Sequence, residues 1–490
     1  MKVLYYYWMQ DNDRNSRGGG VQVYLKNIID YLKKSDDMEI FTLSSGIAYD
    51  GKKKCRVEKL SDEDGVKRFQ LVNSPMLAPS KSSFYEQDIY LNDEIVKNVF
   101  REFLRAIGGV DVIHFQSFEG LTQKVWELKE EFPETKFIFS LHNYQCFCPQ
   151  VNLWKNDSVC CDDFHCGADC VSCLGAYPGS ASFRKYYIMD YYLRKFGMGK
   201  YSKPLLNQTK QIYKKLKPSK VSEKTVTADK FAVSVDKSVA DMFLMFRQKN
   251  VQYMNRYADA VLCVSKRVKD IAVRMGIKEE IAKVSYIGTA FAEHQATESR
   301  YPYTGGVLKM AYMGYMRRDK GFYFLLETLE KMNPLIAENL AIVVAAKFED
   351  PAAVERLRAL KQKLADVILY DGYTHEQIPE ILNGVHLGIV PVLWEDNLPQ
   401  VAIEFSAMGI PVLAADRGGA SELSGSKYFV FESGNSDDFT RKIRQIMRYP
   451  EIGKEYYREK MRLITMREHC DMLMDIYWEN RKHTMHAQSY

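Results

Sequence analysis

The sequence predicts an α/β protein made of two parallel-sheet domains, and three observations support this. Short apolar runs rich in β-branched and aromatic residues alternate with amphipathic helical stretches along most of the chain. These runs are almost continuously apolar, which is typical of parallel strands covered by helices on both faces. The chain has 490 residues, too many for one ordinary hydrophobic core. Sheets of this type bind ligands at the carboxyl ends of their strands.

The predicted strands form two groups separated by a polar stretch. The first group comprises 2–8, 111–116, 136–142 and 260–265, and the second 308–314, 340–347, 386–392 and 410–416. Apolar residues at helical spacing predict helices over 21–34, 94–107, 121–132 and 322–332. Residues 288–306 are polar and turn-forming, as expected of a linker. We expect a first domain over 1–295, a second over 296–465, and a helix within 466–490 that packs back on the first.

Charge is distributed unevenly along an otherwise ordinary globular composition. Hydrophobic residues make up 46% and charged residues 27% of the chain. No apolar run approaches eighteen residues and the N-terminus lacks a secretory signal, so we expect a cytoplasmic protein. Residues 184–220 contain eleven Lys and Arg and one acid, a local charge of +10. This charge favours an anionic partner, and we expect peripheral contact with the inner face of a membrane. The alternative is a solvated insertion.

Seven of the ten cysteines lie between residues 146 and 173. We expect a Cys-rich insertion over about 146–175, followed by a basic insertion over about 176–255. In a reducing cytosol, close cysteines favour metal over disulfides. The spacing predicts one structural zinc, and the alternative is a set of small buried thiols. The candidate ligands are Cys148, Cys160 or Cys161, Cys170 and Cys173.

The segment from Trp394 to Leu423 carries the most chemical information. Asp396 and Glu404 are eight positions apart, and Pro399 suits a first helical turn, with Asn397 or Leu398 near the cap. Glu404 would then lie about two turns into a helix whose uncapped N–H groups suit a diphosphate. Carboxylates beside such a site can accept hydrogen bonds from sugar or ribose hydroxyls. Gly418 and Gly419 follow the next strand, where backbone can approach a ligand closely.

This segment resembles the signature of glycosyltransferase family 4, in which an acid, seven residues and a Glu precede "A-x-G-x-P-V" and "G-G-x-x-E". The run 314–321 is similar to the family's "G-R-x-x-x-x-K-G" loop, and the glycines after residue 18 to its N-terminal double glycine. The resemblance extends over some 400 residues in the family's order. The matching positions are Gly19, Gly20, Asp396, Glu404, Ala407, Gly409, Pro411, Val412, Gly418, Gly419 and Glu422.

The resemblance implies the GT-B fold: two Rossmann-like domains facing across a cleft, here with the Cys-rich and basic insertions in the N-terminal domain. It implies a retaining hexosyltransferase that uses a UDP- or GDP-sugar, with no cofactor required for transfer. The acceptor would be a glycan or a lipid-linked carrier in surface-polysaccharide biosynthesis. By position, Glu404 would bind the ribose, Asp396 the transferred sugar, and Lys320 the diphosphate. The implied donor-binding residues are Gly19, Gly20, Arg317, Arg318, Lys320, Asp396, Asn397, Leu398, Pro399 and Glu404.

Three positions depart from the family pattern. Tyr315 stands where an Arg is expected, so the charge on the diphosphate would be neutralised by Arg317 or Arg318. The first acid is Asp396 rather than Glu, and the neighbouring Glu395 would compensate for its shorter reach. Gln116 replaces a second His after His114, which leaves His142 as the candidate catalytic histidine of the cleft. We interpret His114 as a hydrogen-bonded core histidine.

Other functions remain as alternatives. A catalytically silent, glycosyltransferase-like scaffold is favoured by Tyr315, whereas the presence of Glu404 and Lys320 favours an active enzyme. A zinc-containing nucleic-acid-binding protein would use the cysteines and the basic insertion, but no finger-like spacing supports it, and we expect no nucleic-acid partner. Residues 11–13 match the letters of a metal-binding Asp-x-Asp motif, which we interpret as a solvated loop. A nicotinamide dehydrogenase is disfavoured because no G-x-G-x-x-G follows a strand.

Overall fold

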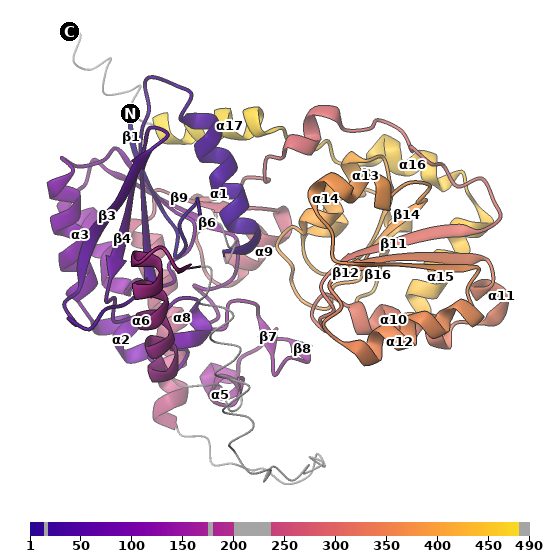
Figure 1. Cartoon of the computed structure of the whole chain (residues 1–490), viewed down its shortest axis with the longest axis horizontal. Helices are drawn as coiled ribbons and strands as arrows, with labels where there is room; N and C mark the ends of the chain where they lie inside the picture. The colour runs from indigo at the N-terminus through magenta and orange to yellow at the C-terminus, as the bar shows by residue number, and fades with distance from the viewer. Residues whose placement is uncertain (14–17, 175–179, 200–236, 480–490) are drawn as a thin grey trace.

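The computed structural model describes residues 1–13, 18–174, 180–199 and 237–479. Two α/β domains lie side by side, the N-terminal domain in indigo to magenta and the C-terminal domain in orange to yellow (Figure 1). Each consists of one large sheet with helices on both faces, so the predicted α/β class with parallel sheets is confirmed.

The N-terminal sheet has eight strands in the order β10-β9-β6-β5-β1-β2-β4-β3. All neighbours pair in parallel except the edge pair β3–β4, which is antiparallel. The order of strands reverses between β1 and β5, which makes that point the switch at which such sheets bind ligands. The strands are β1 (Lys2–Tyr6), β2 (Glu39–Ala48), β3 (Arg56–Glu63), β4 (Val66–Val72), β5 (Val112–Phe115), β6 (Lys136–Leu141), β9 (Ala260–Cys263) and β10 (Ala282–Val284).

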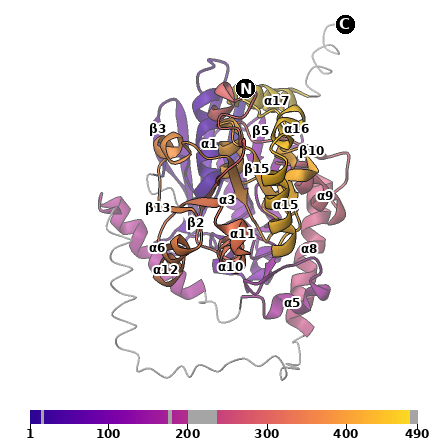
Figure 2. The ribbon, with the colours of Figure 1, turned by 90° about the vertical axis from the view of Figure 1, so that its right-hand side faces the viewer.

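Three of the described helices of this domain lie wholly or mostly in the insertions. In Figure 2, α6 and α8 lie on opposite sides of the domain, and α5 lies near the lower end of α8. A short hairpin, β7 (Trp154–Lys155) and β8 (Val159–Cys160), lies in the Cys-rich insertion. The helices are α1 (Gly19–Leu32), α2 (Gln87–Asn92), α3 (Ile95–Ala106), α4 (Leu128–Glu131), α5 (Ala168–Val171), α6 (Ser180–Lys195), α8 (Lys237–Tyr257) and α9 (Lys266–Arg274), with 3-10 turns η1 (Ser80–Ser83), η2 (Gln123–Glu127), η3 (His165–Gly167) and η5 (Ala290–His294).

The C-terminal sheet has six parallel strands in the order β13-β12-β11-β14-β15-β16, with its switch point between β11 and β14. Its strands are β11 (Leu308–Gly314), β12 (Leu340–Ala346), β13 (Asp366–Asp371), β14 (Leu387–Val390), β15 (Val412–Ala415) and β16 (Val430–Phe431). Its helices are α10 (Phe322–Lys331), α11 (Pro334–Ala337), α12 (Pro351–Ala359), α13 (Ile378–Ile381), α14 (Gln400–Ala407), α15 (Ser436–Arg448) and α16 (Ile452–Glu459), with 3-10 turns η6 (Leu360–Gln362), η7 (His375–Gln377), η8 (Gly419–Leu423) and η9 (Lys427–Phe429).

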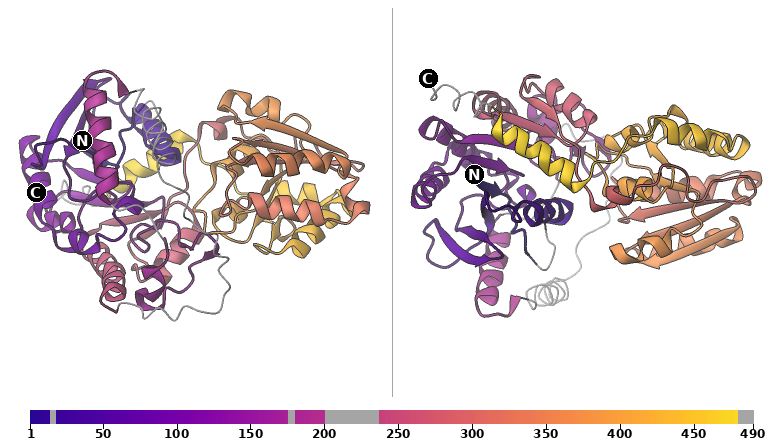
Figure 3. Two further views of the ribbon diagram at one scale, coloured as in Figure 1. Left: turned by 60° about the horizontal axis from the view of Figure 1, so that its bottom comes forward. Right: turned by 90° about the horizontal axis from the view of Figure 1, so that it is seen from above.

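The last described helix, α17 (Met466–Trp478), leaves the C-terminal domain and packs on the N-terminal one, as Figure 3 shows from above. The Tyr477 hydroxyl lies 3.1 Å from the Tyr5 hydroxyl and 2.6 Å from His114 Nδ1. The two chain crossings between the domains run side by side, because Thr289 pairs with Thr465 in a parallel bridge. The domains are therefore joined by a double connection rather than by one linker.

One predicted element has a different form. The helix expected over 121–132 is the 3-10 turn η2 followed by the single turn α4. Pro133 follows directly, and the residue before a proline is disfavoured in helical conformation, so the segment ends early.

Candidate functional site

A cleft of about 630 Å³ lies between the two domains. The N-terminal domain contributes the start of α1 and the end of β6, through Gly20, Tyr24 and His142. The C-terminal domain contributes residues that follow β11 and β14 on either side of its switch point, among them Tyr315 and Pro391. The cleft therefore occupies the position at which ligands bind open α/β sheets.

The loop 394–399 between β14 and α14 forms much of the cleft wall. Pro399 is the N-cap and α14 begins at Gln400, so Glu404 lies about one turn into the helix, not two as the sequence suggested. Within the described chain α14 has no side-chain cap, and its first turn carries no acid. The exposed N–H groups and the positive end of the helix dipole suit an anion such as a diphosphate.

Glu404 is buried at the cleft wall with only 4% of its surface exposed. One carboxylate oxygen lies 3.4 Å from His375 Nδ1, whereas Oε2 has no hydrogen-bond partner among the described residues. Burial raises the pKa of this carboxyl above its ordinary value, and the nearby His375 opposes part of that shift. A buried acceptor without a partner is costly, and a ligand hydroxyl can supply the missing hydrogen bond.

Lys320 and Asp396 form an ion pair inside the cleft. Lys320 Nζ donates to Asp396 Oδ2 at 2.6 Å and lies 5.1 Å from the centre of the Trp394 ring. Lys320 is positioned by Gly321, whose φ is +73° and where a Cβ atom would lie 1.6 Å from the carbonyl oxygen of Pro391. Only glycine fits there, which explains why the "K-G" pair of the sequence motif places a lysine at this point.

Gly418 and Gly419 pack against the backbone of the loop 394–399. A Cβ on Gly418 would lie 2.2 Å from the carbonyl oxygen of Asp396, and one on Gly419 2.3 Å from that of Asn397. The sequence suggested that these glycines approach a ligand. Instead they approach the 396–397 backbone, and the Gly419 N–H donates to the Asp396 carbonyl at 2.8 Å.

Glu395 does not compensate for the shorter Asp396, because its carboxylate is engaged elsewhere. Arg267 of the N-terminal domain and Arg417 both donate to it, with Nε of Arg267 at 2.9 Å and Nη1 of Arg417 at 3.2 Å. The Gly418 N–H adds a third hydrogen bond at 3.0 Å. Burial raises the pKa of Glu395, but the hydrogen bond and charge of Arg267 outweigh it and hold the pKa below its ordinary value. Glu395 therefore ties the two domains together directly beside Asp396.

The three candidate polar residues at the ends of β5 and β6 separate into a core residue and a cleft pair. His114 is fully buried between Tyr477 and Ser140 Oγ, so its interpretation as a core histidine is supported. His142 lines the cleft, with Nε2 2.7 Å from Gln116 Oε1 and its ring edge-on to Tyr24. Burial lowers the pKa of His142 to about 3, so its imidazole is neutral near pH 7.

Of the remaining predicted donor residues, some line the cleft and others do not. Gly20 lines the cleft at the start of α1 next to Gly19, whereas Arg317 and Arg318 are not among the lining residues. Arg317 is paired with Asp319, with Nε 2.9 Å from Oδ1. Among the described residues, the lysines and arginines that do line the cleft are Lys320 and Lys347. Lys347 follows β12 directly and was not among the predicted site residues. Its position at the carboxyl end of a predicted strand, where ligands of parallel sheets bind, is the sequence feature that indicates it.

The predicted zinc site is not formed. Within the described residues, no three His, Cys, Asp or Glu side chains gather as ligands for a metal. Cys160 donates to the Leu393 carbonyl at 3.3 Å, away from the other candidates. The other four, Cys148, Cys161, Cys170 and Cys173, line one small cavity. Arg247 also lines that cavity and donates to Cys170 Sγ at 3.2 Å, which places a positive charge beside the thiols. Burial raises the pKa of Cys161 to about 12, which favours the thiol over the thiolate that binds zinc.

The Asp-x-Asp motif at 11–13 is not the solvated loop that was expected. Asp11 is buried, and both of its oxygens accept hydrogen bonds from Arg68, the shortest at 2.8 Å. Asp13 accepts from Arg194 Nη1 at 2.9 Å. Both carboxylates are committed to arginines, so the structure gives a protein-internal role to what resembled a metal motif.

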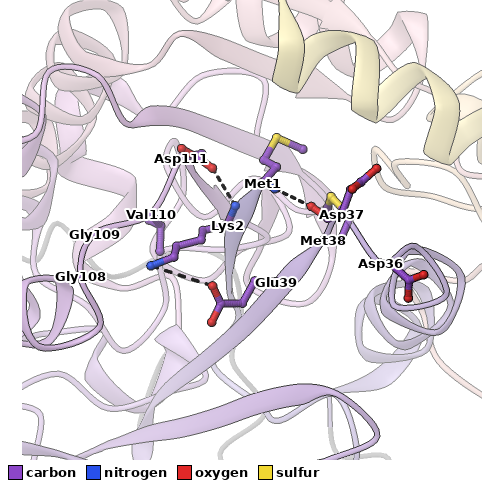
Figure 4. Close-up of a pocket in the computed structure, with 10 residues that line it drawn as sticks. All are labelled: Met1, Lys2, Asp36, Asp37, Met38, Glu39, Gly108, Gly109, Val110 and Asp111. Atoms are coloured by element: carbon purple, nitrogen blue, oxygen red, sulfur yellow. Dashed lines mark hydrogen bonds and ion pairs between the residues drawn. The ribbon is translucent and has the colours of Figure 1, made fainter.

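A further hollow lies at the opposite edge of the N-terminal sheet, at the amino ends of β1 and β2 (Figure 4). Its polar groups bind one another: the Lys2 N–H donates to Asp111 at 2.7 Å, and Lys2 Nζ lies 3.9 Å from Glu39. It is remote from the carboxyl edge where ligands of parallel sheets bind, and we assign it no function.

Comparison with known proteins finds similarity in the C-terminal domain. Residues 308–449 match the family model described as "Glycosyl transferases group 1". A lipopolysaccharide 1,2-N-acetylglucosaminetransferase of Salmonella typhimurium is 29% identical over 147 residues, which cover 28% of this chain. The matched part spans about two fifths of that relative, 39% of its length.

Solved structures resemble the whole chain at low identity. Sucrose-phosphate synthase from Thermosynechococcus elongatus aligns with a TM-score of 0.55 at 14% identity, covering 100% of both chains. HepE of Anabaena, solved in complex with UDP and glucose, gives 0.53 at 14% identity, covering 98% of this chain and all of that one. The lipopolysaccharide outer core galactosyltransferase WaaB in its apo form gives 0.53 at 12% identity, covering 98% and 99%. With the two Rossmann-like sheets facing one cleft, these likenesses establish the GT-B fold.

Proposed function

We propose that this chain, whose residues 308–449 match the model of the glycosyl transferases group 1 family, transfers a hexose from a UDP- or GDP-sugar to an acceptor with retention of configuration. The observation that carries the proposal is Glu404: a buried carboxylate with one oxygen unpartnered among the described residues, one turn into an uncapped helix, in an interdomain cleft. Ribose hydroxyls would satisfy the carboxylate while the first turn of α14 binds the diphosphate.

The charges of the cleft support a leaving diphosphate. Lys320 and Lys347 line it, whereas Tyr315 occupies the place of the arginine in the family pattern. We propose that Lys347, rather than Arg317 or Arg318, supplies the second cation. Lys320 is paired with Asp396 in the free protein, so donor binding would exchange this pair for contacts from Lys320 to phosphate and from Asp396 to the sugar. Positioning and charge neutralisation are what such a transfer requires of a protein.

UDP is the first nucleotide to test, because the structurally similar HepE was solved with UDP and glucose. The deciding experiment is calorimetric titration with UDP and GDP, followed by donor hydrolysis over a panel of nucleotide sugars. Binding of one nucleotide with slow hydrolysis of its sugar supports the proposal. Binding without hydrolysis or transfer of any donor would instead support the silent scaffold, and absence of binding would refute both.

We further propose that the acceptor is a glycan carried on a lipid at an anionic membrane surface. Within the described residues, none of the helices combines the length and apolarity that crossing a bilayer requires. Most of the basic segment 184–220 lies outside the described residues, but its beginning is helix α6. Just beyond the end of α6, Phe196 is 71% exposed and Met198 43% exposed, next to the exposed Lys195. Aromatic and basic side chains together suit the headgroup region of a membrane.

Vesicle sedimentation tests this contact. The protein should bind vesicles containing anionic lipid more strongly than neutral ones, and Phe196→Ser combined with Lys195→Gln should weaken that binding. Equal absence of binding to both vesicle types at low salt would refute membrane contact without affecting the proposed transfer reaction.

A further inference from the structure

A second large hollow, of about 870 Å³, lies within the N-terminal domain. It is enclosed by the inserted helix α6 on one side and by the loop after β1 together with β2, β3 and β4 on the other. In the described part of the chain it shares no lining residue with the interdomain cleft. We call it the α6 pocket; its lining residues with polar side chains are Gln10, Asn12, Asp13, Ser44, Glu58, Lys59, Gln70, Asp190, Tyr191, Arg194 and Lys195.

One charge cluster, a partly exposed arginine between two buried carboxylates, forms part of this lining. Arg194 of α6 donates through Nη1 to Asp13 at 2.9 Å and through Nε to Asp190 at 2.8 Å. The two carboxylate side chains are only 4% and 2% exposed. Nη2 of Arg194 is buried and has no hydrogen-bond partner among the described residues. A guanidinium N–H without a partner, held between two carboxylates, offers donor and acceptor atoms side by side.

The chemistry of the lining indicates the class of ligand. Three carboxylates, Asp13, Glu58 and Asp190, are balanced by three cations, Lys59, Arg194 and Lys195. The described lining therefore has no net charge, and much of it comes from the C-terminal end of α6, where the helix dipole disfavours phosphate. Carboxylates, amides and hydroxyls suit a neutral molecule with many hydroxyl groups, each both donor and acceptor. The pocket is also larger than the interdomain cleft, with room for more than one sugar ring.

The position of the pocket relates it to the transfer reaction. Met9, Gln10, Asn12 and Asp13 line the pocket, and Gly20, seven positions after Asp13, lines the interdomain cleft. Gln22 of α1 holds Asp13 close to the start of that helix: its amide donates to the Asp13 carbonyl at 2.9 Å and accepts from the Gly18 N–H at 2.9 Å. Both sites lie at the carboxyl edge of the N-terminal sheet. A chain of sugars held in the pocket would therefore extend from Asp13 past Gln22 towards the donor.

We propose that the α6 pocket binds neutral sugar residues of the acceptor glycan, and that the insertion carrying α6 selects the acceptor. This inference rests on the proposed function and adds a carbohydrate site built from residues of the insertion. Arg194 acts as a binding residue through Nη2 and as a positioning residue for Asp13 and Asp190.

Saturation-transfer NMR tests the proposal with defined probes: maltose, lactose and the methyl glycosides of glucose, galactose, mannose and N-acetylglucosamine, with UDP or GDP present. At least one probe should give a signal with the wild type. In Arg194→Met its affinity should fall at least about tenfold, the effect of losing a hydrogen bond to a charged group. The matched control is Arg256→Met on α8, whose guanidinium is 66% exposed and bound to Glu130. It should bind the probe as the wild type does.

Nucleotide titration separates this inference from the proposed function. Arg194→Met should bind UDP or GDP as the wild type does, because Arg194 does not line the interdomain cleft. If no probe binds the wild type, or if both arginine variants bind equally well, the pocket is not a sugar site. Displacement of the probe by millimolar inorganic phosphate would also overturn the proposal, since it would indicate an anion site. If Arg194→Met does not fold, Gln70→Leu serves instead; Gln70 lines the same pocket and makes one long hydrogen bond of 3.5 Å to Glu58.

Discussion

Glu404→Gln is expected to make the free protein more stable and its nucleotide binding weaker. The substitution keeps the size of the side chain and removes a charge that is 4% exposed, 3.4 Å from one histidine nitrogen. Burial holds the pKa of Glu404 above its ordinary value. A raised carboxyl pKa means that the folded protein retains a proton that the unfolded chain has lost. Stability therefore falls as the pH rises from the ordinary glutamate value through the folded one.

The magnitude follows from the partners of the carboxylate. Oε2 has no partner among the described residues, so ribose hydroxyls would form charge-assisted hydrogen bonds to it on binding. Their loss should weaken nucleotide affinity by ~1–3 kcal/mol, which is about 5- to 150-fold. Removing the buried charge should raise the midpoint of thermal unfolding by about 2–4 °C for each kcal/mol recovered.

The assay combines titration calorimetry with UDP or GDP and thermal unfolding at pH 5 and pH 8. The matched control is Glu380→Gln, an exposed glutamate on α13 of the same domain, which should change neither quantity. The difference in stability between Glu404→Gln and the wild type should be larger at pH 8. Unchanged nucleotide affinity, or a variant less stable than the wild type at pH 8, would refute this account of Glu404.

Three further predictions concern the charges around the cleft and the cysteines. Lys320→Ala should reduce turnover more than tenfold, because losing one group that stabilises the leaving diphosphate costs ~2–4 kcal/mol. Arg318→Ala should retain near-normal turnover. Equal losses in the two variants would contradict the proposed contact from Lys320 to the diphosphate. Glu395→Gln should lower the unfolding midpoint more at pH 7 than at pH 3. The pKa of Glu395 is lowered, so its stabilisation is full above the ordinary glutamate value and declines as the pH falls below it; an equal effect at both pH values would count against the Arg267 contact. Incubation with EDTA should leave the midpoint of thermal unfolding, measured by calorimetry, unchanged. A large fall in the midpoint would instead support a structural metal.

The secondary structure and the main site residues were accessible to sequence reasoning because they depend on local patterns. Buried parallel strands are continuous apolar runs, and all eight predicted strands are present. Asp396 and Glu404 are separated by a fixed number of residues at the start of one helix, so their spacing alone brings them to one wall of the cleft. The same holds for Lys320, which lies between a strand and a glycine that must approach another backbone segment.

Residues whose role depends on partners distant in the chain could not be assigned in this way. Glu395 and Asp396 are adjacent and chemically alike, yet the first pairs with Arg267, 128 positions away, and the second faces the cleft with Lys320. The loop containing Asp11 was expected to be solvated, yet folding places Arg68 against this carboxylate. The sequence shows which charged side chains the protein has and how far apart they are along the chain. Which cation a carboxylate pairs with is decided only when the packed domains bring the two within a few ångströms, because Coulomb energy depends on distance in space.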